Sequence, residues 1–131
     1  MLSELQRREV ERLIEEVEGD EDILAVFLFG SRARGDERPD SDADICLVMR
    51  GDPSEDEMAR KKLRYLKFSG LDIHLFNALP IYIRRRVLKE GKLLFVRDED
   101  ELYEVAFRTV QAFEDFKHLY YDYLREIERD R

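Results

Sequence analysis

The chain has 131 residues, of which 44% are hydrophobic and 41% are charged, and its formal net charge is −8. This balance argues against a broad footprint on duplex DNA or RNA, because phosphate binding needs a clustered basic face. The single cysteine, Cys46, leaves no internal disulfide or cysteine-rich metal site, and no apolar run approaches the ~20 residues of a membrane span. Residues 1–16 are too charged for a signal peptide, so we expect a cytoplasmic protein.

The first third of the chain predicts a helix followed by a buried strand. Ser3 and Gln6 have the spacing of a capping box, and apolar residues then recur at helical intervals, so we expect a helix over residues 3–18. The run Ile23–Phe29 is continuously apolar and ends at Gly30. Such a run is typical of a strand that is covered on both faces.

Capping residues, turn residues and apolar periodicity divide residues 44–96 into strands and helices. We expect a strand over Asp44–Met49, a helix over about 55–66, a strand over Leu71–Asn77, a helix over about 80–90 and a strand over Lys92–Val96. Because strands and helices are mixed along the chain without a linker, the sequence predicts one domain, over residues 1–131, of the α/β or α+β class.

From Asp98 to about Glu128 the sequence contains no Gly or Pro, and apolar residues recur every three or four positions. We expect one long helix over residues 98–128, attached to a core of about residues 1–97. At ~1.5 Å per residue this helix is about 45 Å long, whereas a domain of this size has a radius of gyration of about 14 Å. Part of the helix should therefore overhang the core.

The long helix carries more aromatic side chains than one packed stripe needs. They are Phe107, Phe113, Phe116, Tyr120, Tyr121 and Tyr123. Such a face could pack on the core, form the seam of a homodimer or dock another protein. The pattern alone leaves these three interpretations open, and with them the choice between a homo-oligomer and a hetero-oligomer.

Two aspartates stand where the second strand begins. Asp42 and Asp44 are two residues apart, and in an extended chain this spacing points both side chains to the same face. Two adjacent carboxylates repel each other unless a cation or a proton lies between them. Since carboxylate oxygens suit hard cations, the pair predicts a site for Mg²⁺ or Mn²⁺.

The other end of the same stretch has the features of a phosphate site. Gly30 lets the backbone approach a ligand closely, and backbone N–H groups with the Ser31 hydroxyl can hold phosphate oxygens. Arg32 and Arg34 add positive charge in an otherwise acidic chain. These four residues predict a phosphate-binding turn that faces the metal site.

A third carboxylate belongs to this site if the strand that begins near Asp72 lies beside the strand of Asp44. Asp72 would then complete the coordination of the ion or take a proton from an attacking hydroxyl. His74 shares the face of Asp72, but no second His or Cys lies in register with it. We interpret His74 as a structural or supporting residue.

The stretch GSRARGDERPDSDAD resembles the signature of the DNA polymerase beta-like nucleotidyltransferase superfamily, in which a Gly-Ser pair is followed by ten residues and by Asp-x-Asp. Gly30-Ser31, residues 32–41 and Asp42-Ala43-Asp44 have this spacing. The short chain is most similar to the minimal nucleotidyltransferases, or MNT proteins. These are commonly the antitoxins of HEPN–MNT toxin–antitoxin pairs.

The resemblance implies a small mixed β-sheet with packed helices, ATP as the nucleotide donor and two bound Mg²⁺ ions. It implies that Asp42, Asp44 and Asp72 bind the metal ions and carry the catalysis. It further implies that the nucleotide phosphates are held by Gly30, Ser31, Arg32, Arg34 and Ser41.

In the MNT interpretation the acceptor is a tyrosine hydroxyl of a cognate HEPN toxin, a ribonuclease, and the attached AMP silences that toxin. Two alternatives stay open. One is a stand-alone nucleotidyltransferase that modifies a small molecule, as the aminoglycoside-modifying relatives do. The other is a non-catalytic antitoxin that neutralises its toxin by binding alone, although three intact aspartates speak against it.

Overall fold

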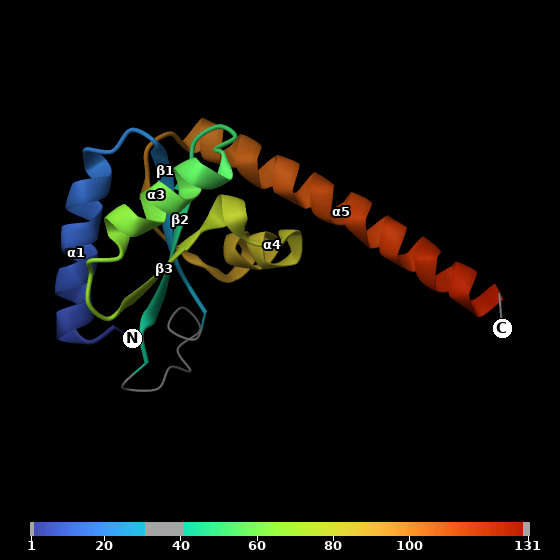
Figure 1. Ribbon diagram of the computed structural model, residues 1–131, viewed down its shortest axis with the longest axis horizontal. Helices are drawn as coiled ribbons and strands as arrows, with labels where there is room; N and C mark the ends of the chain where they lie inside the picture. The colour runs from blue at the N-terminus through green and yellow to red at the C-terminus, as the bar shows by residue number, and fades with distance from the viewer. Residues whose placement is uncertain (1, 31–40, 130–131) are drawn as a thin grey trace.

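The computed structural model describes residues 2–30 and 41–129. Within these ranges it contains a four-stranded sheet and helices on both of its faces (Figure 1). The elements are α1 (Glu4–Glu18), β1 (Ile23–Phe29), β2 (Ala43–Met49), α3 (Glu55–Tyr65), β3 (Leu71–Leu75), the 3₁₀ turn η1 (Phe76–Ala78), α4 (Ile81–Glu90), β4 (Lys92–Val96) and α5 (Glu99–Arg129). The predicted class of mixed helices and strands is confirmed.

The sheet is mixed, with the strand order β3-β2-β1-β4. β1 pairs antiparallel with both β2 and β4, whereas β2 and β3 run parallel. β1 and β2 occupy the centre and are almost entirely buried, which explains their continuous apolar sequence. The parallel pair requires a crossover connection, and α3 supplies it.

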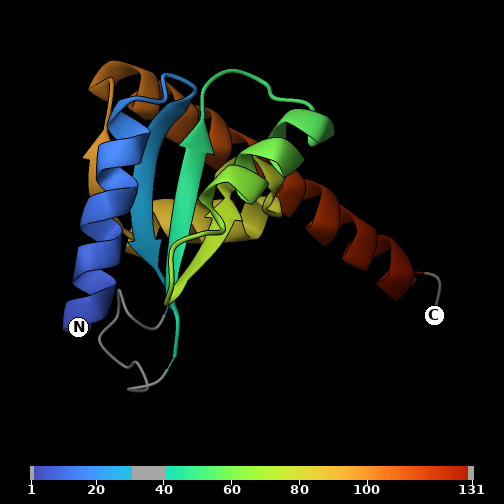
Figure 2. The ribbon, with the colours of Figure 1, turned by 60° about the vertical axis from the view of Figure 1, so that its left-hand side comes forward.

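Helices cover both faces of the sheet (Figure 2), and each face has its own hydrophobic core. On one face, Leu13 and Val17 of α1 and Tyr65 of α3 pack against the sheet. On the other face, Val87 of α4 and Val105 of α5 do so. Successive side chains along a strand point to opposite faces and therefore enter different cores. A polar residue near the end of a strand then lies at the rim of one of these cores.

The predicted capping box of α1 is confirmed: the Ser3 hydroxyl accepts from the N–H of Gln6, and the Gln6 side chain accepts from the N–H of Ser3. The third strand is shorter than predicted, because it ends at Leu75 and the chain turns into η1. The Asn77 amide explains this end. Its Oδ1 accepts from the N–H of Met49 at 2.9 Å, and its Nδ2 donates to the carbonyl of Met49 at 3.2 Å.

With its C-terminal half, α5 projects from the body of the protein as a helical arm (Figures 1 and 2). It has 31 residues and is therefore about 46 Å long. Near its start, Leu102 and Val105 pack against the hydrophobic core on one face of the sheet, and Thr109 is buried. In contrast, every residue from Asp115 to Arg129 is exposed. No helix in the described part of the chain is both long and apolar enough to cross a membrane.

Candidate active site

The candidate site lies at one end of the two central strands and the neighbouring edge strand. Phe29, the last residue of β1, pairs with Asp44 in the second position of β2. Asp44 in turn pairs with Asp72 of β3 across the parallel ladder. The register therefore places the two carboxylates side by side at the rim of the sheet. The strand of Asp72 lies beside the strand of Asp44, which is the condition that the sequence analysis set for Asp72 to join the site.

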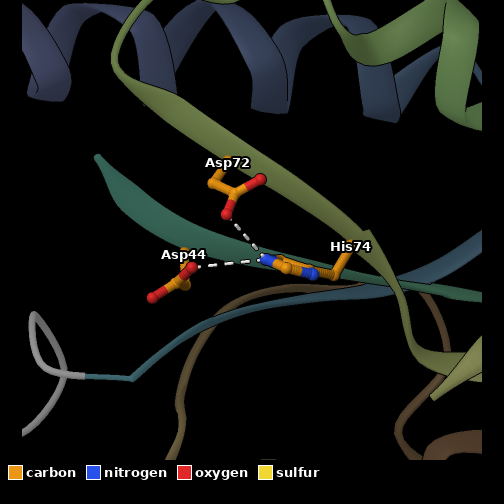
Figure 3. A group of neighbouring side chains, drawn as sticks. All are labelled: Asp44, Asp72 and His74. Carbon is orange, nitrogen blue, oxygen red and sulfur yellow. Dashed lines mark hydrogen bonds and ion pairs between the residues drawn. The ribbon is translucent and has the colours of Figure 1, made fainter. Parts of the chain in front are cut away.

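Three side chains meet at this rim (Figure 3). One ligand atom from each of Asp44, Asp72 and His74 lies within 4.8 Å of the other two. The His74 Nε2 is 3.2 Å from Oδ1 of Asp44 and 3.1 Å from Oδ2 of Asp72. The imidazole thus contacts both carboxylates, a role that the sequence interpretation did not assign to it.

The charged form of Asp44 is disfavoured in this environment. Burial raises the pKa of the Asp44 carboxyl and the negative charge of Asp72 adds to the increase, while the hydrogen bond with His74 partly opposes it. A cation between the carboxylates would remove this repulsion. The half-buried carboxylate of Asp44 and the exposed carboxylate of Asp72 therefore fit a hard divalent cation such as Mg²⁺ or Mn²⁺.

Gly30 closes the first strand directly against Asp44. Its φ angle is +76°, and a Cβ atom at this position would lie 2.5 Å from Oδ2 of Asp44. Both the backbone conformation and the close approach disfavour a side chain at this position. The Gly of the predicted Gly-Ser turn therefore sets the position of the carboxylate as well as the path of the chain.

We expect the substitution Gly30→Ala to lower the free energy of unfolding by about 1 kcal/mol and to reduce nucleotide transfer by about 10–100-fold. The stability loss comes from the left-handed backbone, and the activity loss comes from displacement of the Asp44 carboxylate. Urea unfolding and initial transfer rates measure the two effects.

Gly51→Ala is the matched control. Gly51 has a φ angle of +72°, but nothing lies within 4 Å of an added Cβ. We expect the same loss of stability with an unchanged transfer rate. Equal rates for the two variants would contradict the role of Gly30 at the site.

Gln6 is a second residue whose role the sequence interpretation missed. Beyond capping α1, its Nε2 donates to the carbonyl of Ser41 at 3.1 Å and to that of Gly70 at 3.2 Å. It thereby ties together the segments that lead into β2 and β3. Only the three-dimensional structure reveals this, because 35 and 64 residues separate Gln6 from its partners.

The structure does not test the roles of the remaining predicted site residues. Asp42 is exposed and lies one residue before β2. It does not belong to the group of Asp44, Asp72 and His74, and its metal-binding role stays a prediction. Ser41 is half-buried at the same end of the sheet. Ser31, Arg32 and Arg34 lie outside the described residues, so their phosphate-binding role also stays a prediction.

Comparison with known sequences confirms the resemblance inferred from the motif. The family model described as "Polymerase beta, Nucleotidyltransferase" matches residues 11–100, which include all the strands and the candidate site. A candidate protein adenylyltransferase of Methanocaldococcus jannaschii is 30% identical over 100 residues, which cover 72% of this chain and 73% of the relative.

Solved structures of toxin–antitoxin systems have a similar fold. A toxin–antitoxin structure with AMP-PNP matches with a TM-score of 0.66 at 17% identity, over 92% of this chain and 96% of the other. A complex of tri-AMPylated Shewanella oneidensis HEPN toxin with MNT antitoxin matches with a TM-score of 0.62 at 16% identity, over 93% and 98%. Since 98 of the 131 residues, about three quarters, precede α5, both matches extend into that helix.

Proposed function

The chain belongs to the polymerase beta nucleotidyltransferase family, and from this premise we propose that it transfers AMP from ATP to a hydroxyl group of a partner protein. The observation that carries the proposal is the paired Asp44 and Asp72 at the N-terminal ends of two parallel strands. The similarity to a candidate protein adenylyltransferase supports AMP as the transferred group.

In the proposed site, Asp42, Asp44 and Asp72 would hold two Mg²⁺ ions. When bound, such ions supply Lewis-acid activation of the phosphate and neutralise the charge of the departing pyrophosphate. Phosphate binding is assigned to the turn after β1 and to the segment that leads into β2. The residues proposed for it are Gly30, Ser31, Arg32, Arg34 and Ser41.

The proposed reaction is an in-line displacement at the α-phosphorus of ATP. The acceptor oxygen forms a bond to this phosphorus, the bond to the β-phosphate oxygen breaks, and pyrophosphate leaves. The hydroxyl proton passes to Asp72, whose side chain is 54% exposed and can return the proton to solvent. The products are an AMP ester of the acceptor and pyrophosphate.

We propose a tyrosine of a cognate HEPN toxin as the acceptor, so that the protein acts as an antitoxin. Two features support this choice. Several chains that share the fold come from toxin–antitoxin structures, one of which contains an AMPylated HEPN toxin. The arm of α5 also presents exposed apolar side chains that need a partner, among them Leu119 at 70% and Tyr123 at 61% exposure.

The test is transfer of label from ATP to a cognate HEPN protein, which is to be sought among the genes next to the one for this chain. With purified proteins and Mg²⁺, label at the α-phosphate should remain on the toxin, whereas label at the γ-phosphate should be released. Substitution of the modified tyrosine by phenylalanine should abolish labelling. Retained γ-label would indicate phosphoryl transfer instead, and toxin neutralisation without any label would indicate an antitoxin that acts by binding alone.

Substitutions on α5 separate docking from chemistry in the same assay. Leu119 and Tyr123 are four residues apart and share one face of the helix. The double change Leu119→Glu and Tyr123→Glu should abolish co-purification with the toxin and reduce its labelling. Lys117→Glu, on another face of the exposed arm, is the control for the added charge and should leave binding intact.

A further inference from the structure

The imidazole of His74 points toward both carboxylates at the rim of the site (Figure 3). Asp72 and His74 project from the same face of β3 because they are two residues apart, and Asp44 comes from the adjacent strand. The Nε2 atom is directed at both aspartates, at 3.2 Å and 3.1 Å. The three side chains therefore converge on one point from two strands.

A hydrogen bond accounts for only one of these two contacts. The Nε2 of an imidazole carries at most one proton, so it donates one well-aligned hydrogen bond. The second contact therefore has no Nε2 proton of its own. A cation bound by all three side chains would satisfy both contacts at once.

The distances also fit shared coordination. Ligand atoms about 2.1 Å from an octahedral cation lie about 3.0 Å from their neighbours in the coordination sphere. The separations of 3.2 Å and 3.1 Å between Nε2 and the two carboxylate oxygens are close to this value. The donors thus need only small shifts to occupy three neighbouring positions around one ion.

The ring of His74 is held in this orientation by its surroundings. The side chain is 30% exposed, and its ring meets the Phe29 ring edge-on, with 5.3 Å between the centroids. Phe29 is the last residue of β1, so three adjacent strands contribute to the position of the imidazole. A restrained ring loses little conformational freedom when it binds a ligand.

We propose that His74 is a nitrogen ligand of the metal site and that it makes this site prefer Mn²⁺ to Mg²⁺. The proposal rests on the metal site of the proposed function. Mg²⁺ takes oxygen ligands almost exclusively, whereas an imidazole nitrogen favours first-row transition metals. Two carboxylates and one imidazole therefore offer both oxygen and nitrogen ligands, whereas a site made of aspartates alone offers only oxygen.

The first test detects the nitrogen directly. The chain has only two histidines, His74 and His118, and His118 lies on the exposed arm of α5. Mn²⁺ added alone to the full-length protein should give a ¹⁴N modulation in electron spin-echo spectra. The modulation should disappear in His74→Gln and persist in His118→Gln. Its absence from the wild type would overturn the proposal.

The second test measures selectivity by titration of each metal alone. We expect the preference for Mn²⁺, expressed as the ratio of the Mg²⁺ and Mn²⁺ dissociation constants, to fall about tenfold or more in His74→Gln and in His74→Ala. Glutamine retains an N–H donor, so a histidine that only positions the carboxylates would leave the ratio unchanged and overturn the proposal. Circular dichroism checks that each variant is folded.

These measurements use neither ATP nor an acceptor. A protein that shows the nitrogen signal but transfers no AMP would contradict the proposed function and leave the role of His74 intact. A protein that transfers AMP with an unchanged metal ratio in His74→Gln would contradict the role of His74 alone.

Discussion

Asp44→Asn is expected to reduce AMP transfer at least about a thousandfold while the protein remains folded. The substitution keeps the size of the side chain but removes the negative charge that the metal ions need, and a loss of about 4 kcal/mol in transition-state stabilisation corresponds to this factor. Asp44 lies between its register partners Phe29 and Asp72, so its carboxylate is held beside that of Asp72 at the rim of the sheet. Single-turnover rates with α-labelled ATP measure the effect.

In the absence of metal ions, the Asp44→Asn variant should be at least as stable as the wild type. Burial and the charge of Asp72 raise the pKa of Asp44, so the folded protein pays a free-energy cost to keep this carboxyl charged at neutral pH. Asparagine removes that cost, and the melting temperature should stay the same or rise by a few degrees. A variant that loses activity because it unfolds would contradict this account.

Asp52→Asn is the matched control for the loss of one negative charge. Asp52 is exposed and follows the opposite end of β2, and we expect it to leave the transfer rate unchanged within about twofold. If Asp44→Asn kept more than about a tenth of the wild-type rate, Asp44 would not be a metal ligand of the reaction.

Much of the fold follows from local patterns in the sequence. The N-cap residues, the apolar runs and the Gly residues delimit most elements within one or two residues, because these features act over a few positions. The alternation in β2 and β3 also indicates that Asp44 and Asp72 point away from the core made by Ile45 and Ile73. The type of chemistry at the rim could therefore be predicted.

The position of His74 and the hydrogen bonds from Gln6 to the segments before β2 and β3 could not be predicted with the same rules. Both depend on which strands are neighbours, and local periodicity carries no information on strand order. His74 gave one signal, its spacing of two from Asp72, but a lone histidine on a strand is more often structural. Gln6 gave only its capping signal, because its other partners lie far away in the sequence.

The largest expected effect on stability concerns Asp20, which lies in the turn between α1 and β1. Its side chain is 5% exposed and accepts hydrogen bonds from Lys61 at 2.9 Å and 3.1 Å and from the hydroxyl of Tyr65 at 2.8 Å. Arg64 lies 3.1 Å from the same carboxylate. This network ties α3 to the turn that starts the central strand.

Asp20→Asn should lower the free energy of unfolding by about 3 kcal/mol at neutral pH. The asparagine leaves the 11% exposed ammonium of Lys61 without its buried counter-charge, and breaking one partner of a buried pair costs about 3–5 kcal/mol. Asp22→Asn is the control, because Asp22 contacts the same Lys61 at 3.0 Å but is 71% exposed. That change should cost less than about 1 kcal/mol. Urea unfolding at about pH 7 compares the three proteins.

The difference between wild type and Asp20→Asn should shrink in acid. Burial alone would raise the pKa of Asp20, but the hydrogen bonds from Lys61 and Tyr65 outweigh it and hold the pKa below the ordinary value of 3.8. The stabilisation is therefore complete above that ordinary value and is lost as the pH falls through the lower pKa of the folded protein. Unfolding curves between about pH 2 and pH 7 measure this convergence. A gap that stayed constant over this range would show that the charge of Asp20 does not contribute to stability.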